Sequence, residues 1–423
     1  MRGSLTIFVF LTFLQFLSSQ DYLEISCGAG YNKQAYVNLA NETQKTVNND
    51  AWDIAFTAFG VQDAGIFINE SSGSSLGQNL PTAEVYFTYS DDFNSDFDIS
   101  ILEDNTLLND ELSWNYGAFN GTRDTLNAFD FGWGQYEPTS HGVIGYQVFI
   151  VKLRNGDYKK IFFESLVGTA YTFKYANLDG TNLVTKTIDK TVDGKGKSLI
   201  FFNLSSNSVV DVLPDNGYDF MYGRYISIAT DPNGTIIQQY NVTGVLSAPG
   251  VSCVSADNVD FNTVNFDDYK DGLSEKMDVI GYDWKTFSGT GWSLDDNRVF
   301  FLKSTDNTVW KLQFIDFEGS STGTAVLSKE NLGKISATEE VEVQVLVYPN
   351  PTHEQLSVLS PEKIVNFTFF DASGRMSYSV PTERHDGSLY VYTFDVSNMA
   401  NGIYVIQGNS ASEKSLKTKF VKE

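Results

Sequence analysis

The chain has 423 residues, a formal net charge of −24 and an aromatic content of 14%. This length is sufficient for two to four domains, and so acidic a surface repels a phosphate backbone, which argues against nucleic-acid binding. The 32 Phe and 22 Tyr residues, many of them alternating with polar ones, favour half-buried strands. We therefore expect an all-β fold.

The first residues, 1–20, have the composition of a secretory signal peptide. Arg2 provides an early positive charge, the apolar run Leu5–Leu17 follows, and a short Ser-Ser-Gln stretch closes the segment. The apolar run is shorter than the ~20 residues that a membrane-spanning helix needs. No other stretch qualifies, so the sequence predicts an exported protein without a transmembrane helix.

The chain has two cysteines, Cys27 and Cys253. An oxidising destination favours a disulfide between them, which would tie the mature N-terminus to the second half of the chain. Two buried thiols are the equal alternative, because the sequence does not show whether the two Cα atoms come close enough.

A repeated theme occupies the chain between the signal and the C-terminal tail. Trp133 and Trp284 are each followed, at the same spacing, by a strand-like block, VFIVK in the first copy and VFFLK in the second. A turn and a returning strand follow each block, which predicts a β-hairpin in each copy. Such constant spacing indicates an internal duplication. We place the first unit at residues 21–190 and the second at residues 191–333.

The upstream parts of the two units also correspond, since WDIAF (Trp52–Phe56) matches YDFMY (Tyr218–Tyr222). WDIAF, the VFIVK strand and the later block VFFLKSTDNTVWKLQFIDFEGSSTGT resemble the HmuY family. HmuY proteins are secreted or surface haem-binding proteins of Bacteroidetes with an all-β fold. The resemblance covers residues 21–333 and implies two HmuY-like antiparallel β units in tandem. It is weaker after WDIAF, where the family usually has Arg-Thr-Asn-Ser-Gly and this chain reads GIFINESSG.

The resemblance implies a haem or porphyrin ligand, or a haemoprotein partner, because family members hold haem iron through His or Met side chains. Two of the three histidines, His353 and His385, lie in the C-terminal tail, which leaves His141 as the candidate ligand. Met277 and Met221 are the candidate thioether donors. Met221 is more typical of a core side chain, and we expect Met277 to be more exposed.

A porphyrin can also dock against aromatic walls without two axial ligands. The candidates for such a pocket are the aromatic residues around the two repeat anchors: Trp133, Tyr136, Trp284 and Trp292. Trp292 stands in the second unit where the first has His141. The same rings would suit a glycan-binding surface or a hydrophobic core.

The sequence offers little that is typical of an enzyme. Two G-x-S-x-G matches begin at Gly73 and Gly319, but neither is followed by the helical periodicity that a nucleophile elbow requires. Zinc spacings, a P-loop and a dinucleotide fingerprint are absent from the sequence, so haem iron is the only metal suggested. We expect a non-enzymatic protein, with a surface adhesin or glycan-binding β protein as the alternative.

The C-terminal tail, residues 345–423, carries four motifs in sequence: YPNP, DASGR, NGIY and the closing KTKFVKE. Short alternating strands separated by turns predict a small Ig-like β-sandwich. Residues 334–344 have little apolar content and many carboxylates, which is typical of a linker.

The order of these motifs resembles the type A C-terminal sorting domain of the type IX secretion system of Bacteroidetes. The residues that carry the resemblance are Tyr348, Pro349, Asn350, Pro351, Asp371, Gly374, Arg375, Gly402 and Tyr404. The resemblance implies that the type IX machinery is a partner. It also implies a location in the medium or on the outer-membrane surface.

Overall fold

The structure, a computed structural model, describes residues 21–60, 63–75, 78–110, 112–127, 129–230, 236–335, 345–371, 375–377, 381–386, 389–410 and 415–423. They form two compact units, one ending at Lys334 and one beginning at Ile335, which we call the body and the tail domain. The predicted signal peptide and residues 336–344 of the predicted linker lie outside the described residues.

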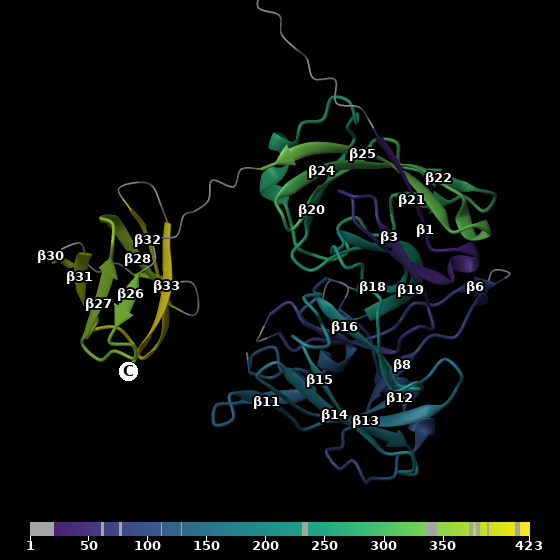
Figure 1. The fold of residues 1–423 in the computed structure, drawn as a ribbon, viewed down its shortest axis with the longest axis horizontal. Helices are drawn as coiled ribbons and strands as arrows, with labels where there is room; N and C mark the ends of the chain where they lie inside the picture. Colours follow the sequence, from purple (N-terminus) through teal and green to yellow (C-terminus); the bar gives the residue numbers. More distant parts are fainter. Residues whose placement is uncertain are drawn as a thin grey trace, which may run out of the picture. The chain divides into compact units, whose positions relative to one another are not determined.

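Both units are built from antiparallel strand pairs, and the helices of the described chain are all single 3-10 turns (Figure 1). The expected all-β fold is confirmed. The turns are η1 (Ala29–Tyr31), η2 (Ile99–Ile101), η3 (Glu103–Asn105), η4 (Ala118–Asn120), η5 (Phe266–Asp268), η6 (Lys270–Gly272) and η7 (Gly319–Ser321).

Two sheets of the body repeat one strand order. The first contains, as successive neighbours, β8 (Glu84–Phe87), β12 (Val148–Lys152), β13 (Tyr158–Val167) and β14 (Ala170–Asn177). The second contains, in the same order, β20 (Ser252–Asp257), β23 (Arg298–Lys303), β24 (Thr308–Phe317) and β25 (Thr324–Lys334). The duplication that the sequence indicates is therefore present in the strand pairing.

The tight turns of the two copies also correspond. Gly156, between β12 and β13, has φ +90°, and Asn307, between β23 and β24, has φ +66°. Gly and Asn are the residues that adopt this left-handed conformation at least cost, which explains why they stand at the hairpin turns.

Further strands extend the two sheets. The first sheet also holds β9 (Thr106–Leu107), β10 (Gly134–Glu137), β11 (Gly142–Gly145) and β15 (Val184–Asp189). The second is completed at its edge by β1 (Asp21–Ser26), which pairs with β25. Two short hairpins complete the set: β6 (Ser74–Ser75) with β7 (Gln78–Asn79), and β21 (Lys285–Phe287) with β22 (Trp292–Leu294).

Two four-stranded sheets join early and late parts of the body. One has the order β17 (Ser208–Val210), β16 (Leu199–Asn203), β4 (Ile54–Thr57) and β5 (Ile66–Ile68). The other has the order β19 (Ile236–Ser247), β18 (Phe220–Thr230), β2 (Lys33–Val37) and β3 (Gln44–Asn48). Strands from both sides of residue 190 thus share sheets, and the division into units at that residue stays a prediction.

Two aspartates make matching contacts across these shared sheets. Asp53, just before β4, accepts a hydrogen bond from the backbone N–H of Leu204 at 2.8 Å. Asp219, just before β18, accepts one from the backbone N–H of Leu39 at 2.7 Å. Both carboxyls are 5% exposed, and burial raises the pKa of each. The WDIAF and YDFMY segments therefore have equivalent places in the body.

Each copy of the duplication has its own aromatic core. Trp133 is 0% exposed and its ring centroid lies 5.9 Å from that of Phe163, edge to face. Trp284 is 1% exposed and stacks on Phe314 with centroids 3.8 Å apart. Both tryptophans pack on the returning strand of their hairpin, which explains the constant spacing seen in the sequence.

The tail domain has two four-stranded sheets. One runs β26 (Leu346–Tyr348), β27 (Gln355–Ser360), β31 (Leu389–Asp395) and β30 (Thr382–Asp386). The other runs β29 (Met376–Ser377), β28 (Ile364–Asp371), β32 (Gly402–Ser410) and β33 (Ser415–Lys422). Its hydrophobic core includes Leu356, Phe369, Phe394, Ile406 and Phe420, each 0% exposed.

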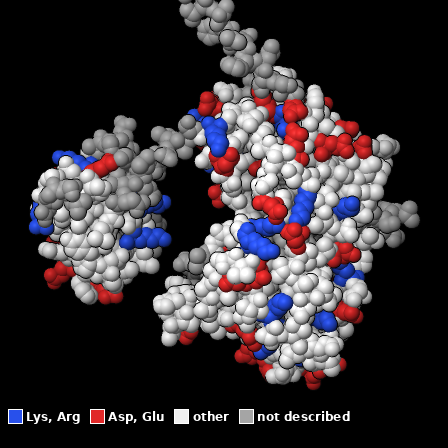
Figure 2. All heavy atoms as spheres, viewed as in Figure 1, with Lys and Arg blue, Asp and Glu red and all other residues white. Residues whose placement is uncertain are grey.

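Charged side chains of both signs are interspersed on the face that Figure 2 shows, without a large basic area. In the described part of the chain, no helix has the length and apolar character needed to cross a bilayer.

Candidate functional site

His141 lies at the turn of the β10–β11 hairpin. Its side chain is exposed and its backbone has φ +52°, a conformation that few residues other than glycine adopt. The Tyr136 hydroxyl lies 3.4 Å from the imidazole Nδ1. When Nδ1 carries the proton and donates it to this hydroxyl, Nε2 keeps a free lone pair that can bind a metal.

The hairpin borders a cavity of about 410 Å³. Aromatic and aliphatic side chains form its wall, namely Phe129, Phe131, Tyr136, Val143 and Leu166. Phe129 is 56% exposed and stacks on Tyr136 with ring centroids 5.6 Å apart. The volume falls within the ~300–1,000 Å³ of small-molecule sites, and the wall is apolar as in such sites.

A second cavity, of about 550 Å³, shares Phe131 with the first. Its wall includes Phe59, which is 43% exposed, and Tyr116. The guanidinium of Arg123 lies 3.8 Å from the centroid of the Tyr116 ring, a cation–π contact that holds the ring in place. The two cavities therefore form one aromatic surface on either side of Phe131.

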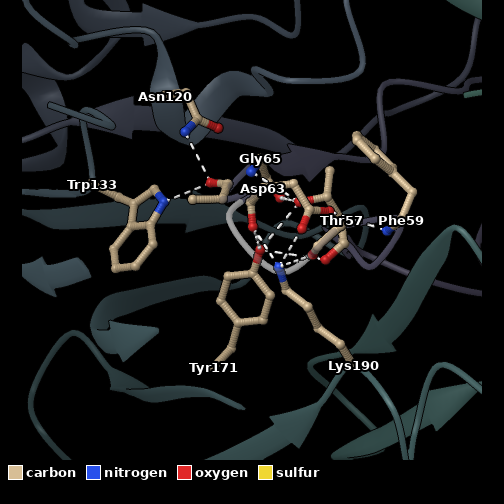
Figure 3. A network of polar contacts seen from close by, with 10 residues as sticks. Thr57, Phe59, Asp63, Gly65, Asn120, Trp133, Tyr171 and Lys190 are labelled. Carbon is tan, nitrogen blue, oxygen red and sulfur yellow. Dashed lines mark hydrogen bonds and ion pairs between the residues drawn. The ribbon is translucent and has the colours of Figure 1, made fainter. Parts of the chain in front are cut away.

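A buried ion pair includes Asp63, one of the residues that line the second cavity (Figure 3). The Lys190 ammonium pairs with the Asp63 carboxylate, and the two side chains are 4% and 6% exposed. The ammonium also donates to the backbone carbonyls of Asp63 at 2.6 Å and Gly60 at 2.9 Å. Burial lowers the pKa of Lys190, while Asp63 opposes that shift.

Hydroxyl groups extend the network toward β5. The Tyr171 hydroxyl lies 3.1 Å from Thr57 Oγ1 and donates to the backbone carbonyl of Asp63 at 3.1 Å. Thr57 Oγ1 in turn accepts from the backbone N–H of Gly65 at 3.0 Å. Figure 3 shows the Tyr171 hydroxyl and the Lys190 ammonium converging on this segment. The network holds both described ends of the β4–β5 loop, which lines the shared aromatic surface.

Neither anchor tryptophan lines the cavities described above, and both rings are buried, so their place in a pocket wall stays a prediction. The indole N–H of Trp133 donates to the Ala64 carbonyl at 2.9 Å, and that of Trp284 to the Gly281 carbonyl at 3.2 Å. Each ring is enclosed by its own core, so neither is available to a ligand.

The other two aromatic candidates do border cavities. Tyr136 lines the cavity beside His141. Trp292, at the start of β22, is 39% exposed and lines a further cavity of about 440 Å³ together with Phe287.

Met221 and Met277 come together at one small cavity of about 70 Å³. They are 6% and 3% exposed, so the expectation that Met277 is the more exposed is wrong. The Met277 carbonyl accepts from the Ser247 N–H at 2.8 Å, and the Trp114 indole N–H donates to the Ser247 carbonyl at 2.6 Å. These contacts draw Met277 into the core, and the space left is far below the ~300 Å³ of small-molecule sites.

Cys27 and Cys253 are both free and fully buried. The Cys27 thiol donates to the Gly323 carbonyl at 3.4 Å, and the Cys253 sulfur lies 3.2 Å from the Ser247 hydroxyl. Burial raises the pKa of each thiol to about 12. The structure therefore corresponds to the second of the two alternatives, a pair of buried thiols.

The YPNP motif packs against the last strand of the tail domain. Both of its X-Pro peptide bonds are cis. Asn350 accepts a hydrogen bond from the Val421 N–H at 2.8 Å and donates to the Lys419 carbonyl at 3.3 Å. Tyr348 is 42% exposed. The motif thus ties the start of the domain to β33.

Hydrogen bonds also hold the described residues of the DASGR and NGIY motifs. Asp371 accepts from the backbone N–H of Arg375 at 2.9 Å, while Gly374 lies outside the described residues. Gly402 begins β32, and the Tyr404 hydroxyl donates to the Ala400 carbonyl at 2.9 Å.

Sequence reasoning located His141 and Tyr136 but missed the Asp63–Lys190 pair. Their separation in the chain and the absence of a motif around either residue left no signal for it. Within the described ranges, no group of three or more His, Cys, Asp or Glu side chains could hold a metal ion.

Two families match the chain. Residues 30–178 match the family described as HmuY protein, and this match includes the His141 hairpin and most of its cavity wall. Residues 346–423 match the secretion system C-terminal sorting domain, which corresponds to the tail domain. No curated protein matches the sequence. The chain thus combines an HmuY region with a type IX C-terminal sorting domain, and is a protein exported to the cell surface or the medium.

Proposed function

We propose that the protein captures haem or a related porphyrin, without catalysing a reaction on it, in the cavity beside His141. One observation carries the proposal: a single exposed imidazole at the tip of a hairpin borders an aromatic cavity of about 410 Å³. Both lie within the region that matches HmuY, and the resemblance of the chain to this family implies a haem ligand.

The residues of this cavity fit a porphyrin. An imidazole Nε2 is a donor that haem iron accepts, and the rings of Phe129 and Tyr136 supply flat apolar surface for the macrocycle. Among the described residues that line the cavity, His141 is the sole His or Met side chain. In this cavity His141 would therefore hold the iron of a bound haem. The haem would supply a Lewis-acidic iron and a flat macrocycle that the aromatic rings can contact.

The local backbone supports a ligand role for His141. A non-glycine residue at φ +52° carries a conformational cost, and such residues cluster at binding sites. The hydroxyl of Tyr136 restricts the rotation of the ring through its contact with Nδ1. Both features hold the imidazole at the rim before any ligand arrives.

A binding role without catalysis agrees with the composition of the cavity wall. Its members are apolar or aromatic apart from one imidazole and one phenol hydroxyl, so it lacks the paired carboxylates that hydrolysis of a glycoside would need.

The test is a titration of the purified protein with haemin, followed by the Soret absorption band. We expect a shifted Soret band that saturates at one haemin per chain. His141→Gly should weaken binding at least tenfold without disturbing the turn, because glycine tolerates the positive φ. His353→Gly is the matched control, since this histidine is exposed and lies in the tail domain. A titration without a Soret shift, or one that His141→Gly leaves unchanged, would refute the proposal.

A glycan-binding role is the second candidate, and the neighbouring cavity of about 550 Å³ favours it. Its wall combines the Phe59 and Tyr116 rings with the polar Asn115, a mixture suited to stacking and hydrogen bonding with a sugar. Glycan-array binding that Tyr116→Ala abolishes, in a protein that does not shift the haemin spectrum, would favour this role instead.

A further inference from the structure

The cavity beside the β21–β22 hairpin is the counterpart, in the second copy, of the cavity beside His141. Three pairs of lining residues stand at the spacing by which Trp284 follows Trp133: Phe131 and Tyr282, Tyr136 and Phe287, and His141 and Trp292. The duplication therefore produced two cavities in equivalent places, with different chemistry at equivalent positions.

Two buried cations line the second cavity. Arg224, on β18, is 6% exposed, and Lys285, on β21, is 7% exposed. The first cavity has no cation among its described lining residues, and Gly134 stands at the place of Lys285. Lysine and arginine are among the residues least often buried in proteins, so the burial of two of them at one cavity calls for a functional explanation.

The Lys285 ammonium has three N–H donors, and backbone carbonyls accept from two of them. It donates to the carbonyls of Thr243 at 2.5 Å and Tyr282 at 3.2 Å. It also lies 4.0 Å from the centroid of the Trp284 ring. No carboxylate of the described chain lies within ion-pair distance of Lys285, and the neighbouring Asp283 pairs with Arg298 at 3.0 Å. An ammonium has three donors, so one remains for an incoming acceptor.

Two aromatic rings stand at the mouth of this cavity. Phe287 is 56% exposed and Trp292 is 39% exposed, and their ring centroids lie 5.1 Å apart. Exposed rings beside buried cations are the complement of a molecule with a flat apolar part and a negatively charged end.

We propose that the second cavity binds a small planar carboxylate, with the carboxylate directed to Lys285 and Arg224 and the ring against Phe287 and Trp292. The net charge of −24 repels anions from the surface as a whole, so selectivity for an anion requires local cations such as these. The volume of about 440 Å³ admits a molecule of one or two fused rings. This site is independent of porphyrin capture beside His141.

The test compares naphthoate with naphthamide, its uncharged isostere, by isothermal titration calorimetry on the purified protein. We expect naphthoate to bind at one per chain and at least tenfold more tightly than naphthamide. Lys285→Met keeps the aliphatic stem and should weaken naphthoate at least tenfold while leaving naphthamide unchanged. Lys276→Met, at an exposed lysine, is the matched control, and His141→Gly should leave naphthoate binding intact.

The pH dependence gives a readout that needs no variant. Burial lowers the pKa of Lys285 to about 7 in the ligand-free cavity. Asp283 and Cys27 act on its charge, and Arg224, Tyr31 and Tyr282 line the same cavity. Burial raises the pKa of Cys27 and Tyr31 to about 12 each, so both stay neutral near neutral pH. A carboxylate binds the protonated amine, so its affinity should fall up to about tenfold per pH unit above pH ~7.

Equal affinity for naphthoate and naphthamide, or no binding of either, would overturn the proposal. So would naphthoate binding that stays constant with pH, or that a folded Lys285→Met protein retains in full.

Discussion

At the scale of single residues, Lys190 and Asp63 form a buried ion pair, in which each charge compensates the burial of the other. A buried ammonium without its carboxylate costs several kcal/mol, because the interior does not solvate the charge as water does. The position of the β4–β5 loop beside the aromatic surface depends on this pair.

Lys190→Met tests that dependence. The substitution leaves Asp63 buried and uncompensated, so we expect the free energy of unfolding to fall by about 3–5 kcal/mol in urea denaturation. The double variant Asp63→Leu with Lys190→Met should recover part of this loss, because both charges are then absent. A single variant as stable as the parent would show that the pair does not hold the loop.

The buried carboxyl of Asp219 should make the stability of the fold depend on pH. Its pKa is raised by burial, so the folded state keeps a proton that the unfolded chain releases above pH ~4. Stability should then decrease as pH rises from about 4 through the raised pKa. Asp219→Asn removes this titration.

The measurement is urea denaturation of both proteins between pH ~4 and ~7. At the acid end the two proteins should have similar stability, because a protonated carboxyl and an amide each offer one carbonyl oxygen and one donor to Ser304 and Leu39. As pH rises, the parent should lose stability relative to Asp219→Asn. A parent that instead gains stability relative to the variant would mean that the carboxylate is stabilised when ionised.

Residue-level inference from the sequence reached His141 because the other two histidines lie in the C-terminal tail. The structure places His141 at the turn of the β10–β11 hairpin, and its ligand role stays a prediction. Met277 was misjudged, since its burial depends on Ser247 and Trp114, which only the folded chain brings near. The anchor tryptophans were recognised by spacing, but spacing alone does not distinguish a core ring from a cavity wall.

At the scale of elements, β1 completes a sheet of the second copy, although the two lie far apart in the chain. Its residues pair with β25, with Ile25 opposite Ala325 and Tyr22 opposite Ser328. Ile25 is 0% exposed and Tyr22 is 58% exposed. Both hairpins could be predicted from the sequence, because their strands are adjacent. The β1–β25 and β2–β18 pairs could not, because their registers are set by packing between distant segments.

Side chains along β1 alternate between the core and the solvent, so this strand offers a buried and an exposed residue for a matched pair of variants. Ile25→Ala should lower the free energy of unfolding by roughly 2–5 kcal/mol, because it leaves a cavity in the core. Tyr22→Ala, on the same strand, should change it by less than about 1 kcal/mol, since the ring is largely in solvent. Equal effects in thermal or urea denaturation would contradict the pairing of β1 with β25.

At the scale of the whole molecule, the chain joins an exported body to a tail domain that carries the sorting motifs. In the tail domain, Asn350 of the YPNP motif bonds to the end strand β33, and Asp371 bonds to the backbone of Arg375. Within the body, the duplication produced two cavities with different side chains, an imidazole in one and two cations in the other. The two copies thus keep one strand order while the side chains at equivalent cavity positions differ.

The most direct test of porphyrin capture is a crystal structure of the protein with haemin bound. We predict a macrocycle against Phe129 and Tyr136, with the iron bonded to Nε2 of His141. A porphyrin held between Met221 and Met277, or seated anywhere that leaves His141 uncoordinated, would contradict this account.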